Sequence, residues 1–398
     1  MLTVEEAQSR VLQGLVPAAS ELVCLEHAVG RVLAADVVSN MTHPPCDLSA
    51  MDGYAIRNED VQALPACLTL VGVSAAGSRY LGSVLRGQAV RIFTGAPIPQ
   101  GADTIVVQER AVLSGTEVFV SEGAAFVAGR HVRRAGLDFQ AGERLLKCGS
   151  RLTSRDVALA AAMNHSKLLC VRSPRVALLA TGNELVHPGS EVPQDHIVSS
   201  SPYGVMADIT VWGGSPTNLG IARDDNTDIR ERIRGARDFD IVVTLGGASV
   251  GDFDLVQSAL GEELKVDFWK VAMRPGKPLI FGKYDGVSFL GLPGNPVSAF
   301  VCALLFLKPM IFRMLGDPSL PWRFIDATTN SPLPTNDERQ EYLRCKLAYT
   351  NAGQVVASPV HTQDSSMLSL LSRSDGLIVR PPLDNAKNAS DVVKVLTF

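Results

Sequence analysis

The chain has 398 residues, of which 46% are hydrophobic, and 37 basic against 41 acidic side chains give it a formal net charge of −4. This length suits about two to four domains that each bury a core, and the composition excludes a disordered chain. The near balance of charge excludes a basic coat for nucleic acid, and 6% aromatic residues are too few for a platform that stacks single-stranded bases. We therefore expect no nucleic-acid partner.

The cysteines and the apolar runs bear on the compartment and on membranes. Seven scattered cysteines form no Cys-x-x-Cys pair, which fits a reducing compartment and neither a disulfide framework nor a structural zinc site. The opening MLTVEEAQSR lacks the basic and apolar regions of a signal peptide. The longest apolar run, Ala299–Leu307, stops at Lys308 and is too short to span a bilayer. We expect a cytoplasmic protein without a membrane segment.

Residues 1–42 read as helical. Apolar residues recur at a spacing of three to four from Val4 to Leu15, and a second stripe runs from Val29 to Val37. This spacing predicts two helices in the first part of the chain.

The pattern then changes to short strands between Gly and Pro turns over residues 43–138, which predicts an inserted β domain. A helical pattern returns within 150–167, with Ser154 as a plausible N-cap. We expect this helix to rejoin the N-terminal helices, so that residues 1–42 and 139–170 form one discontinuous helical domain.

Residues 171–318 differ from the segments before them. Continuous apolar runs such as VALLATG and IVVTLGG alternate with segments of helical length, which predicts a parallel α/β sheet covered on both faces. Short strands return over 319–398 and predict a small C-terminal β domain. The fold class is therefore multidomain, α/β plus β.

Ligands bind outside the carboxyl ends of the strands in an open parallel sheet. Each such end in this sequence carries polar or glycine-rich residues, in the segments TGNEL at 181–185, RDD at 223–225, GGASVGDFD at 246–254, RPGKP at 274–278 and PGNP at 293–296. The glycine-rich loop would let backbone N–H groups approach an anion, although a tight strand-to-helix turn explains it about as well. Asn295 and Pro296 suit the start of a helix, and Lys277 suits a phosphate.

Acidic side chains also cluster at these strand ends. Carboxylate oxygens beside a phosphate site suit Mg²⁺, which takes one or two carboxylates together with phosphates and waters. The acidic residues are Glu184, Asp224, Asp225, Asp252 and Asp254. Helix capping is the alternative explanation for Asp225 and Asp252, and it suits Glu184 less well because Glu caps poorly.

The β module adds loops that contain single polar groups, Asp52, Thr94 and Asp138 among them. Ordinary turn chemistry is the default interpretation of such loops. The pair Arg133 and Arg134 could clamp a phosphate or an oxyanion, but a solvated pair of charges is more common.

In their order and separation, these segments resemble the molybdopterin molybdenumtransferases, the family of MoeA and the gephyrin E domain. The resemblance covers nearly the whole chain and is carried by SAMDGYA at 49–55, FTGAPIPQGAD at 93–103, RRAGLDF at 133–139, TGNEL at 181–185, GGASVGDFD at 246–254, RPGKPLIFG at 274–282 and GLPGNPVSAF at 291–300.

The resemblance implies four parts: a discontinuous helical domain, an inserted β domain, an α/β domain of the molybdopterin-binding type and a C-terminal β-barrel. It implies an elongated homodimer whose active site lies between the α/β domain of one subunit and the β domain of the other. The implied reaction takes adenylylated molybdopterin and molybdate as substrates, uses Mg²⁺ and releases AMP. A molybdopterin adenylyltransferase and apo-molybdoenzymes would be the partners.

The resemblance also assigns candidate residues. The catalytic candidates are Asp52, Thr94, Asp138, Glu184, Asp224, Asp254 and Lys277, of which Glu184, Asp224 and Asp254 would hold the metal. The candidates for binding the pterin and its phosphates are Thr181, Gly182, Gly246, Gly247, Ser249, Gly251, Arg274, Pro293, Gly294, Asn295 and Pro296. Because carboxylates repel molybdate, we place that oxyanion, as a hypothesis, at Arg133, Arg134 or Arg274.

Several positions depart from the family pattern. Leu137 and Asn183 stand where acidic residues are usual, Ser199–Ser201 replaces Asp-Ser-Asn, Arg274 replaces Lys, and Asp364–Met367 replaces Gly-Ser-Gly-Met. The lost acidic groups leave open a second interpretation, a molybdopterin-binding carrier or scaffold without turnover. A phosphohydrolase that acts on another nucleotide is a third, against which the match in the β module argues.

Overall fold

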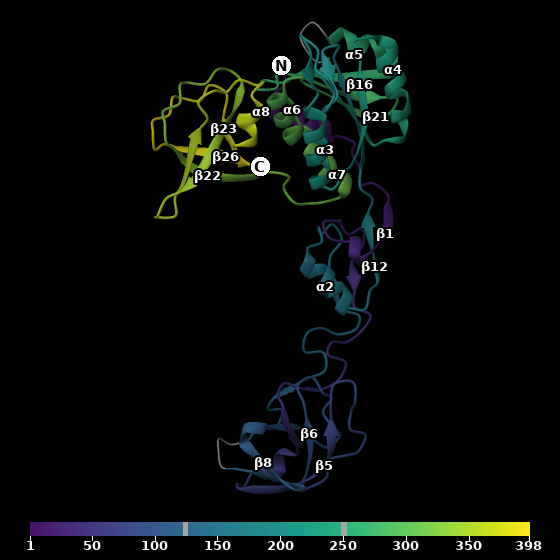
Figure 1. Cartoon of the computed structure of the whole chain (residues 1–398), viewed down its shortest axis with the longest axis vertical. Helices are drawn as coiled ribbons and strands as arrows, with labels where there is room; N and C mark the ends of the chain where they lie inside the picture. The colour runs from purple at the N-terminus through teal and green to yellow at the C-terminus, as the bar shows by residue number, and fades with distance from the viewer. Residues whose placement is uncertain (122–125, 248–252) are drawn as a thin grey trace.

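The computed structural model describes residues 1–121, 126–247 and 253–398. The molecule is elongated: the α/β domain and the C-terminal β domain lie side by side at one end, and the inserted β domain lies at the other end (Figure 1). A small middle unit, which contains β1, β12 and α2, joins the two ends. The limits of the four domains stay a prediction.

The middle unit is built from segments far apart in the sequence. Strand β1 (Ser20–Cys24) pairs antiparallel with β12 (Lys167–Val171), and β2 (Val37–Val38) pairs with β11 (Arg144–Leu146). Helix α2 (Ser154–Ala162) covers their apolar side chains. Its N-cap is Thr153, one residue before the cap expected from the sequence, because the Thr153 hydroxyl accepts the N–H of Asp156.

The helix expected from Val29 to Val37 is absent from this fully described segment, so that prediction was wrong. Gly30 has a φ of +79°, a conformation that interrupts a helix. Val32 and Leu33 are buried through isolated β-bridges to Arg151 and Cys170 instead. Their apolar spacing reflects burial against distant segments rather than a helical face.

The first predicted helix is confirmed as α1 (Val4–Leu12), which begins with a capping box formed by Thr3 and Glu6. Its buried residues Val4, Ala7 and Val11 pack into the core of the α/β domain. The helix therefore contacts the α/β domain instead of the helix α2 that it was expected to join.

The inserted β domain is a six-stranded sheet in the order β7-β4-β6-β5-β9-β8. The strands are β4 (Gly53–Ile56), β5 (Ala66–Ser74), β6 (Gln88–Ile92), β7 (Thr104–Val107), β8 (Ala111–Ser114) and β9 (Glu117–Val120). A Cβ at Gly53 would lie 2.0 Å from the carbonyl oxygen of Val106, so only glycine fits where these two strands meet. The predicted inserted β structure is confirmed.

The α/β domain has a six-stranded sheet in the order β16-β13-β17-β21-β20-β18. Its strands are β13 (Arg175–Thr181), β16 (Ser215–Ala222), β17 (Ile241–Leu245), β18 (Leu264–Lys270), β20 (Pro278–Tyr284) and β21 (Val287–Leu292). The helices are α3 (Ser201–Trp212), α4 (Asn226–Arg234), α5 (Phe253–Leu260), α6 (Pro296–Cys302) and α7 (Lys308–Leu315). Two separate apolar clusters involve the sheet residues, which fits a sheet covered on both faces.

Only the first four strands of this sheet are parallel, because β20 and β21 form an antiparallel hairpin. The hairpin turns at Asp285 and Gly286, which both have positive φ. Asp-Gly between two apolar runs is a strong hairpin signal. The prediction of a parallel sheet is therefore right for the four strands that carry the candidate site.

Helices α6 and α7 form one long helix through a π-helical segment, η6 (Ala303–Leu307). Pro309 has no N–H to donate to the carbonyl of Leu305 four residues back. Gln8 donates to the Leu305 carbonyl at 3.2 Å, and Trp322 donates to the Leu304 carbonyl at 2.9 Å. The continuous helix, Pro296–Leu315, is long and apolar enough to cross a membrane by composition, but 72% of its apolar window is buried inside the fold.

Replacing Trp322 by Phe is expected to lower the free energy of unfolding by about 1–2 kcal/mol, because the Leu304 carbonyl loses its donor while most of the ring packing is kept. Urea unfolding followed by circular dichroism measures the change. Gln8→Ala removes the donor to the neighbouring carbonyl and should give a similar loss. Unchanged stability in Trp322→Phe would mean that water satisfies this carbonyl.

The C-terminal domain is a closed β-barrel, as the resemblance implied. Its strands follow the order β23-β24-β22-β26-β25, and a pairing between β23 and β25 closes the barrel. The strands are β22 (Arg323–Thr329), β23 (Gln340–Tyr349), β24 (Val355–Pro359), β25 (Gly376–Arg380) and β26 (Val392–Thr397). The short strand β19 (Met273–Arg274) of the α/β domain pairs parallel with β23, so the two domains share a backbone ladder.

Candidate functional site

A cavity of about 600 Å³ lies at the carboxyl ends of the parallel strands. Its walls follow β13, β16, β17 and β21, as the topology of an open α/β sheet predicts. Ten candidate residues line it: Thr181, Gly182, Glu184, Asp224, Gly246, Gly247, Pro293, Gly294, Asn295 and Pro296. The structure thus brings together residues that are up to 115 positions apart in the sequence.

Glycines give the wall of this cavity its shape. Gly246 has a φ of +99°, and a Cβ there would lie 2.6 Å from the carbonyl oxygen of Thr181. Gly182, with a φ of +151°, leaves room for the carboxylate of Glu184, which would lie 2.6 Å from an added Cβ. The loops therefore approach one another more closely than residues with side chains could.

The Thr181 hydroxyl is an unpartnered polar group at this wall. Thr181 is only 4% exposed, and its Oγ1 has no hydrogen-bond partner within the described part of the chain. A buried hydroxyl without a partner is costly unless a bound molecule satisfies it. This atom fits a cavity that receives a polar ligand.

Two of the described acidic residues, Asp224 and Glu184, line the cavity. Asp224 is fixed by Asn183: the Asn183 N–H donates to Asp224 Oδ2 at 3.3 Å, and the Asp224 N–H donates to Asn183 Oδ1 at 3.1 Å. Glu184 lines the same cavity. Asp225 caps helix α4, since its carboxylate accepts the Thr227 N–H at 3.1 Å, so the capping explanation holds for that residue.

Part of the candidate set lies outside the described residues. Ser249, Gly251 and Asp252 fall in the gap at 248–252, and the side chain of Asp254 is likewise not described. Within the described ranges, no cluster of three or more His, Cys, Asp or Glu side chains could hold a metal ion. The described carboxylates that line the cavity, Glu184 and Asp224, still suit Mg²⁺, because this ion accepts as few as one or two protein carboxylates.

Replacing Asn183 by Asp is expected to raise the affinity for Mg²⁺ about fivefold, because it adds a negative charge beside Asp224 while a carboxylate oxygen can still accept the Asp224 N–H. Isothermal titration with MgCl₂ measures the affinity. Asn218→Asp is the matched control, since its side-chain oxygen also accepts a backbone N–H, that of Gly220 at 2.9 Å, whereas the Asn183 side chain accepts the N–H of Asp224. Equal gains in both variants would indicate a nonspecific charge effect.

The C-terminal domain also reaches the cavity. The side chain of Asn295 does not cap helix α6; its amide N–H donates to the Ser365 hydroxyl at 3.0 Å. The Ser365 carbonyl accepts the N–H of Val297 at 3.0 Å, and the neighbouring Ser366 lines the cavity. Ser366, Ser199 and Ser201, which stand in segments that depart from the family pattern and were not candidate site residues, all line the cavity.

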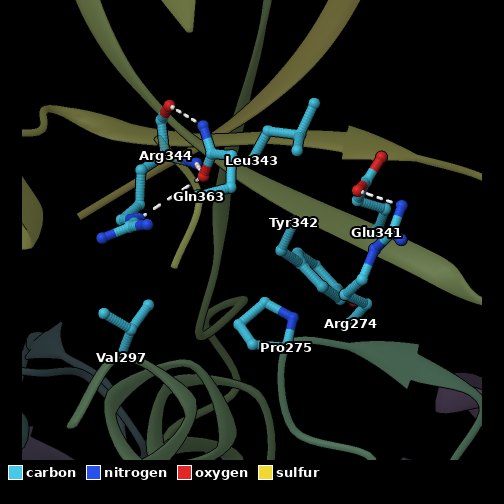
Figure 2. A pocket seen from close by; sticks show the side chains of 8 residues that line it. All are labelled: Arg274, Pro275, Val297, Glu341, Tyr342, Leu343, Arg344 and Gln363. Carbon is cyan, nitrogen blue, oxygen red and sulfur yellow. Dashed lines mark hydrogen bonds and ion pairs between the residues drawn. The ribbon is translucent and has the colours of Figure 1, made fainter. Parts of the chain in front are cut away.

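Lys277 and Arg274 do not line the large cavity. The backbone of Lys277 accepts the N–H of Val271 at 3.1 Å, and the adjoining Pro278 does line the cavity. Arg274 faces the C-terminal domain and forms ion pairs with Glu341 and with Asp337, the latter at 3.5 Å. Arg274 and Glu341 line a second cavity of about 40 Å³ between the two domains (Figure 2).

The candidates from the inserted β domain lie away from the cavity within one chain, because that domain stands at the other end of the molecule (Figure 1). Asp52 Oδ1 accepts the Thr94 N–H at 2.7 Å and the Thr94 hydroxyl at 2.8 Å. The bond from the Thr94 backbone, followed by that from its hydroxyl, lowers the pKa of Asp52. The two residues thus form one preorganised ionised unit.

The remaining β-domain candidates differ in their partners. Arg134 pairs with Asp47 at 2.6 Å, and the neighbouring Ala135 N–H binds the same carboxylate at 2.9 Å. Arg133 lies in the short strand β10 (Val132–Arg133), and Asp138 donates its backbone N–H to the carbonyl of His43 at 3.1 Å. Asp47 therefore offsets the charge of Arg134.

Comparison with protein families matches three consecutive regions of the chain. Residues 2–164 match the MoeA N-terminal region, domains I and II. Residues 177–313 match a probable molybdopterin binding domain, and residues 326–398 match the MoeA C-terminal region, domain IV. The middle match contains the strand ends that form the large cavity.

Individual relatives match over nearly the full length. The chain is 32% identical to the molybdopterin molybdenumtransferase of Haemophilus influenzae, covering 100% of this chain and 99% of the relative, and 35% identical to that of Nostoc, covering 91% and 85%. The crystal structure of a MoeA molybdopterin biosynthesis protein from Pyrococcus horikoshii superposes with a TM-score of 0.86 at 29% identity, covering 100% of this chain and 99% of that one. The chain belongs to the molybdopterin molybdenumtransferase family.

Proposed function

We propose that this protein is a transferase of molybdenum cofactor biosynthesis that inserts molybdate into adenylylated molybdopterin and releases AMP. The observation that carries the proposal is the cavity at the strand ends, where glycine-rich turns and a Thr181 hydroxyl without a partner among the described residues lie beside Glu184 and Asp224. Hydroxyl and backbone N–H donors suit the phosphates, and the carboxylates suit Mg²⁺. Family membership supports the same reaction class.

Each candidate group has a physical role in this proposal. The N-terminus of the long helix that starts at Pro296 and the turn at Gly246 and Gly247 would orient the phosphates of the substrate. Mg²⁺, held by Glu184 and Asp224 and by Asp254, would supply positive charge to the phosphate oxygens. Lys277 would offset the charge that develops on the departing AMP.

A second subunit would complete the site. Asp52 and Thr94 adjoin β4 and β6 of the inserted β domain, which stands at the other end of the molecule from the cavity of its own chain, and this supports a homodimer in which the β domain of one subunit meets the α/β domain of the other. The ionised Asp52 would then face the cavity with its geometry fixed by Thr94. A molybdopterin adenylyltransferase that supplies the substrate, apo-molybdoenzymes that receive the product and a cytoplasmic location belong to the same proposal.

Arg274 is the best supported of the three arginines proposed for molybdate. Arg134 and Arg274 both pair with carboxylates, but Arg274 also lines a cavity together with Arg344, a second positive charge. Val297, the second residue of the long helix that starts at the large cavity, lines this small cavity too. We therefore place the oxyanion at the Arg274 side of the site.

The test incubates the purified protein with adenylylated molybdopterin, Mg²⁺ and molybdate, and follows AMP by chromatography. Release of AMP that depends on molybdate supports the proposal. Tight binding without release would instead indicate the carrier or scaffold, and release from unrelated dinucleotides without molybdate would indicate a phosphohydrolase. Arg274→Ala should raise the molybdate concentration needed for half-maximal release about tenfold, whereas Arg134→Ala should leave it within about twofold.

A further inference from the structure

The small cavity between the α/β domain and the C-terminal barrel has an unusual arrangement of charge. Figure 2 shows Arg344 and Gln363 on one side of it and Arg274 with Glu341 on the other. Its charged lining residues are Arg274, Arg344 and Glu341, so two positive charges face one negative charge. Without the carboxylate, the lining would match a dianion such as molybdate in charge.

Arg344 is fixed in place by the loop that it organises. Its Nη1 donates to the Met367 carbonyl at 3.0 Å, and its Nη2 donates to the carbonyls of Thr362 at 3.0 Å and Asp364 at 2.9 Å. Its Nε donates to Gln363 Oε1 at 3.4 Å. Arg344 is fully buried and supplies a fixed positive charge, but its N–H groups are already engaged.

Arg274 is the guanidinium with freedom to change partners. Its side chain is 45% exposed, while that of its partner Glu341 is 11% exposed. The two residues are direct neighbours in the register of β19 and β23, so the shared backbone ladder holds their side chains on adjacent strands. Asp337, the other carboxylate near Arg274, is bound more closely by Arg339, at 2.6 Å.

With Arg274 and Glu341 paired, the cavity is too small for a tetrahedral oxyanion. About 40 Å³ accommodates only a few water-sized molecules, since one water occupies about 10–15 Å³ on this measure. An anion with four oxygens would fit between Arg274 and Arg344 only if the cavity widened, and separating Arg274 from Glu341, which both line it, would widen it. The same separation removes the negative charge that would repel it.

We propose that Glu341 is a built-in competitor for the oxyanion at Arg274, so that molybdate enters by displacing this carboxylate. This inference rests on the proposed function, which places molybdate at Arg274. Glu341 keeps the guanidinium paired and the cavity closed when no substrate is bound. Its displacement into a largely buried position costs free energy, and this cost sets the molybdate concentration at which the site fills.

The nature of the arginine supports this role. A guanidinium can pair with two carboxylates at once through its planar fork, as Arg274 does with Glu341 and Asp337. It can also exchange one carboxylate for an oxyanion with the same fork geometry. The residue thus suits a site whose internal and external ligands replace each other.

The experiment measures molybdate binding to the full-length protein by isothermal titration, and the molybdate dependence of AMP release. Glu341→Gln keeps the size and shape of the side chain but removes its charge, and it is expected to lower the apparent molybdate Kd about tenfold. Asp337→Asn is the matched control, because Asp337 also pairs with Arg274 but does not line the cavity, and it should change the Kd less than about twofold. Thermal unfolding verifies that each variant is folded, and Glu341→Ala replaces Glu341→Gln if the latter is not.

The outcomes separate this inference from the function on which it rests. A Kd that is unchanged or weaker in folded Glu341→Gln, together with a weaker Kd in Arg274→Ala, overturns the competitor role and leaves Arg274 as the anion ligand. Full molybdate affinity in Arg274→Ala overturns the competitor role of Glu341 and also the placement of molybdate at Arg274. In the double variant Arg274→Ala/Glu341→Gln the gain should vanish, since Glu341 acts only through Arg274. Absence of AMP release from the wild type would contradict the proposed reaction, while the titration still tests Glu341.

Discussion

Replacing Asp224 by Asn is expected to lower the rate of molybdate-dependent AMP release about 100-fold while molybdopterin binding changes less than about threefold. The substitution keeps the shape of the side chain, and the Asn oxygen can still accept the Asn183 N–H. What disappears is the negative charge proposed to help hold Mg²⁺. The rate is measured with saturating substrates, and binding is measured by titration without molybdate.

The neighbouring residue supplies the control for this experiment. Asp225 caps helix α4 through the Thr227 N–H, and Asn is as good an N-cap as Asp. Asp225→Asn removes the same charge one residue away and should leave both turnover and binding within about twofold of the wild type. Equal losses of turnover and binding in Asp224→Asn would show that Asp224 shapes the loop rather than serving the reaction.

Replacing Arg151 by Ala is expected to lower the free energy of unfolding by about 3–5 kcal/mol, because it leaves a buried carboxylate unpaired. Arg151 Nε donates to Asp317 at 2.8 Å, and the Asp317 side chain is 2% exposed. The same guanidinium donates to the carbonyls of Gly30 at 3.0 Å and Trp212 at 3.1 Å. Arg151 thus joins the middle unit to the α/β domain. Arg144→Ala, which breaks an exposed pair with Asp36, should cost less than about 1 kcal/mol.

The pH dependence of this loss tests its cause. Burial raises the pKa of Asp317, but hydrogen bonds from Ser319 and from Arg151 outweigh burial and hold the pKa below its usual value. A carboxyl with a lowered pKa in the folded state stabilises the protein above its unfolded pKa of about 3.9 and loses that contribution as the pH falls through the folded value. The difference between wild type and Arg151→Ala should therefore shrink as the pH falls below about 4. A difference that is constant from pH 7 to pH 3 would assign the loss to the carbonyl contacts instead.

The position of the large cavity could be predicted from the sequence, because parallel strands end at one edge of a sheet. Thr181, Asp224 and Gly246 lie at the ends of three different strands, and recognising those strands was enough to bring the residues together. An N-cap at the start of helix α2 was also predictable. The expected cap was Ser154 and the observed one is the adjacent Thr153, because both residue types are good caps.

Contacts between segments far apart in the sequence could not be predicted in this way. Nothing in the sequence near Arg274 indicates a carboxylate partner for it. Its partner Glu341 comes 67 residues later, on a strand of another domain. The stripe from Val29 to Val37 suited a helix, but Val32 and Leu33 within it are buried by pairing with segments more than 100 residues away. The Asp285 and Gly286 hairpin is a different case, because its signal is local and was readable.

The hydrogen bonds around the π-helical segment have a consequence for how the chain folds during synthesis. The donor Gln8 and the apolar face of α1 leave the ribosome almost 300 residues before the helix from Pro296 to Leu315 that receives them. At about 5–20 residues per second, that face waits about 15–60 seconds for its docking site. The short α1 cannot stay folded alone in water over that time. Helix α1 is thus translated long before its docking site and is among the last of the described helices to reach its place.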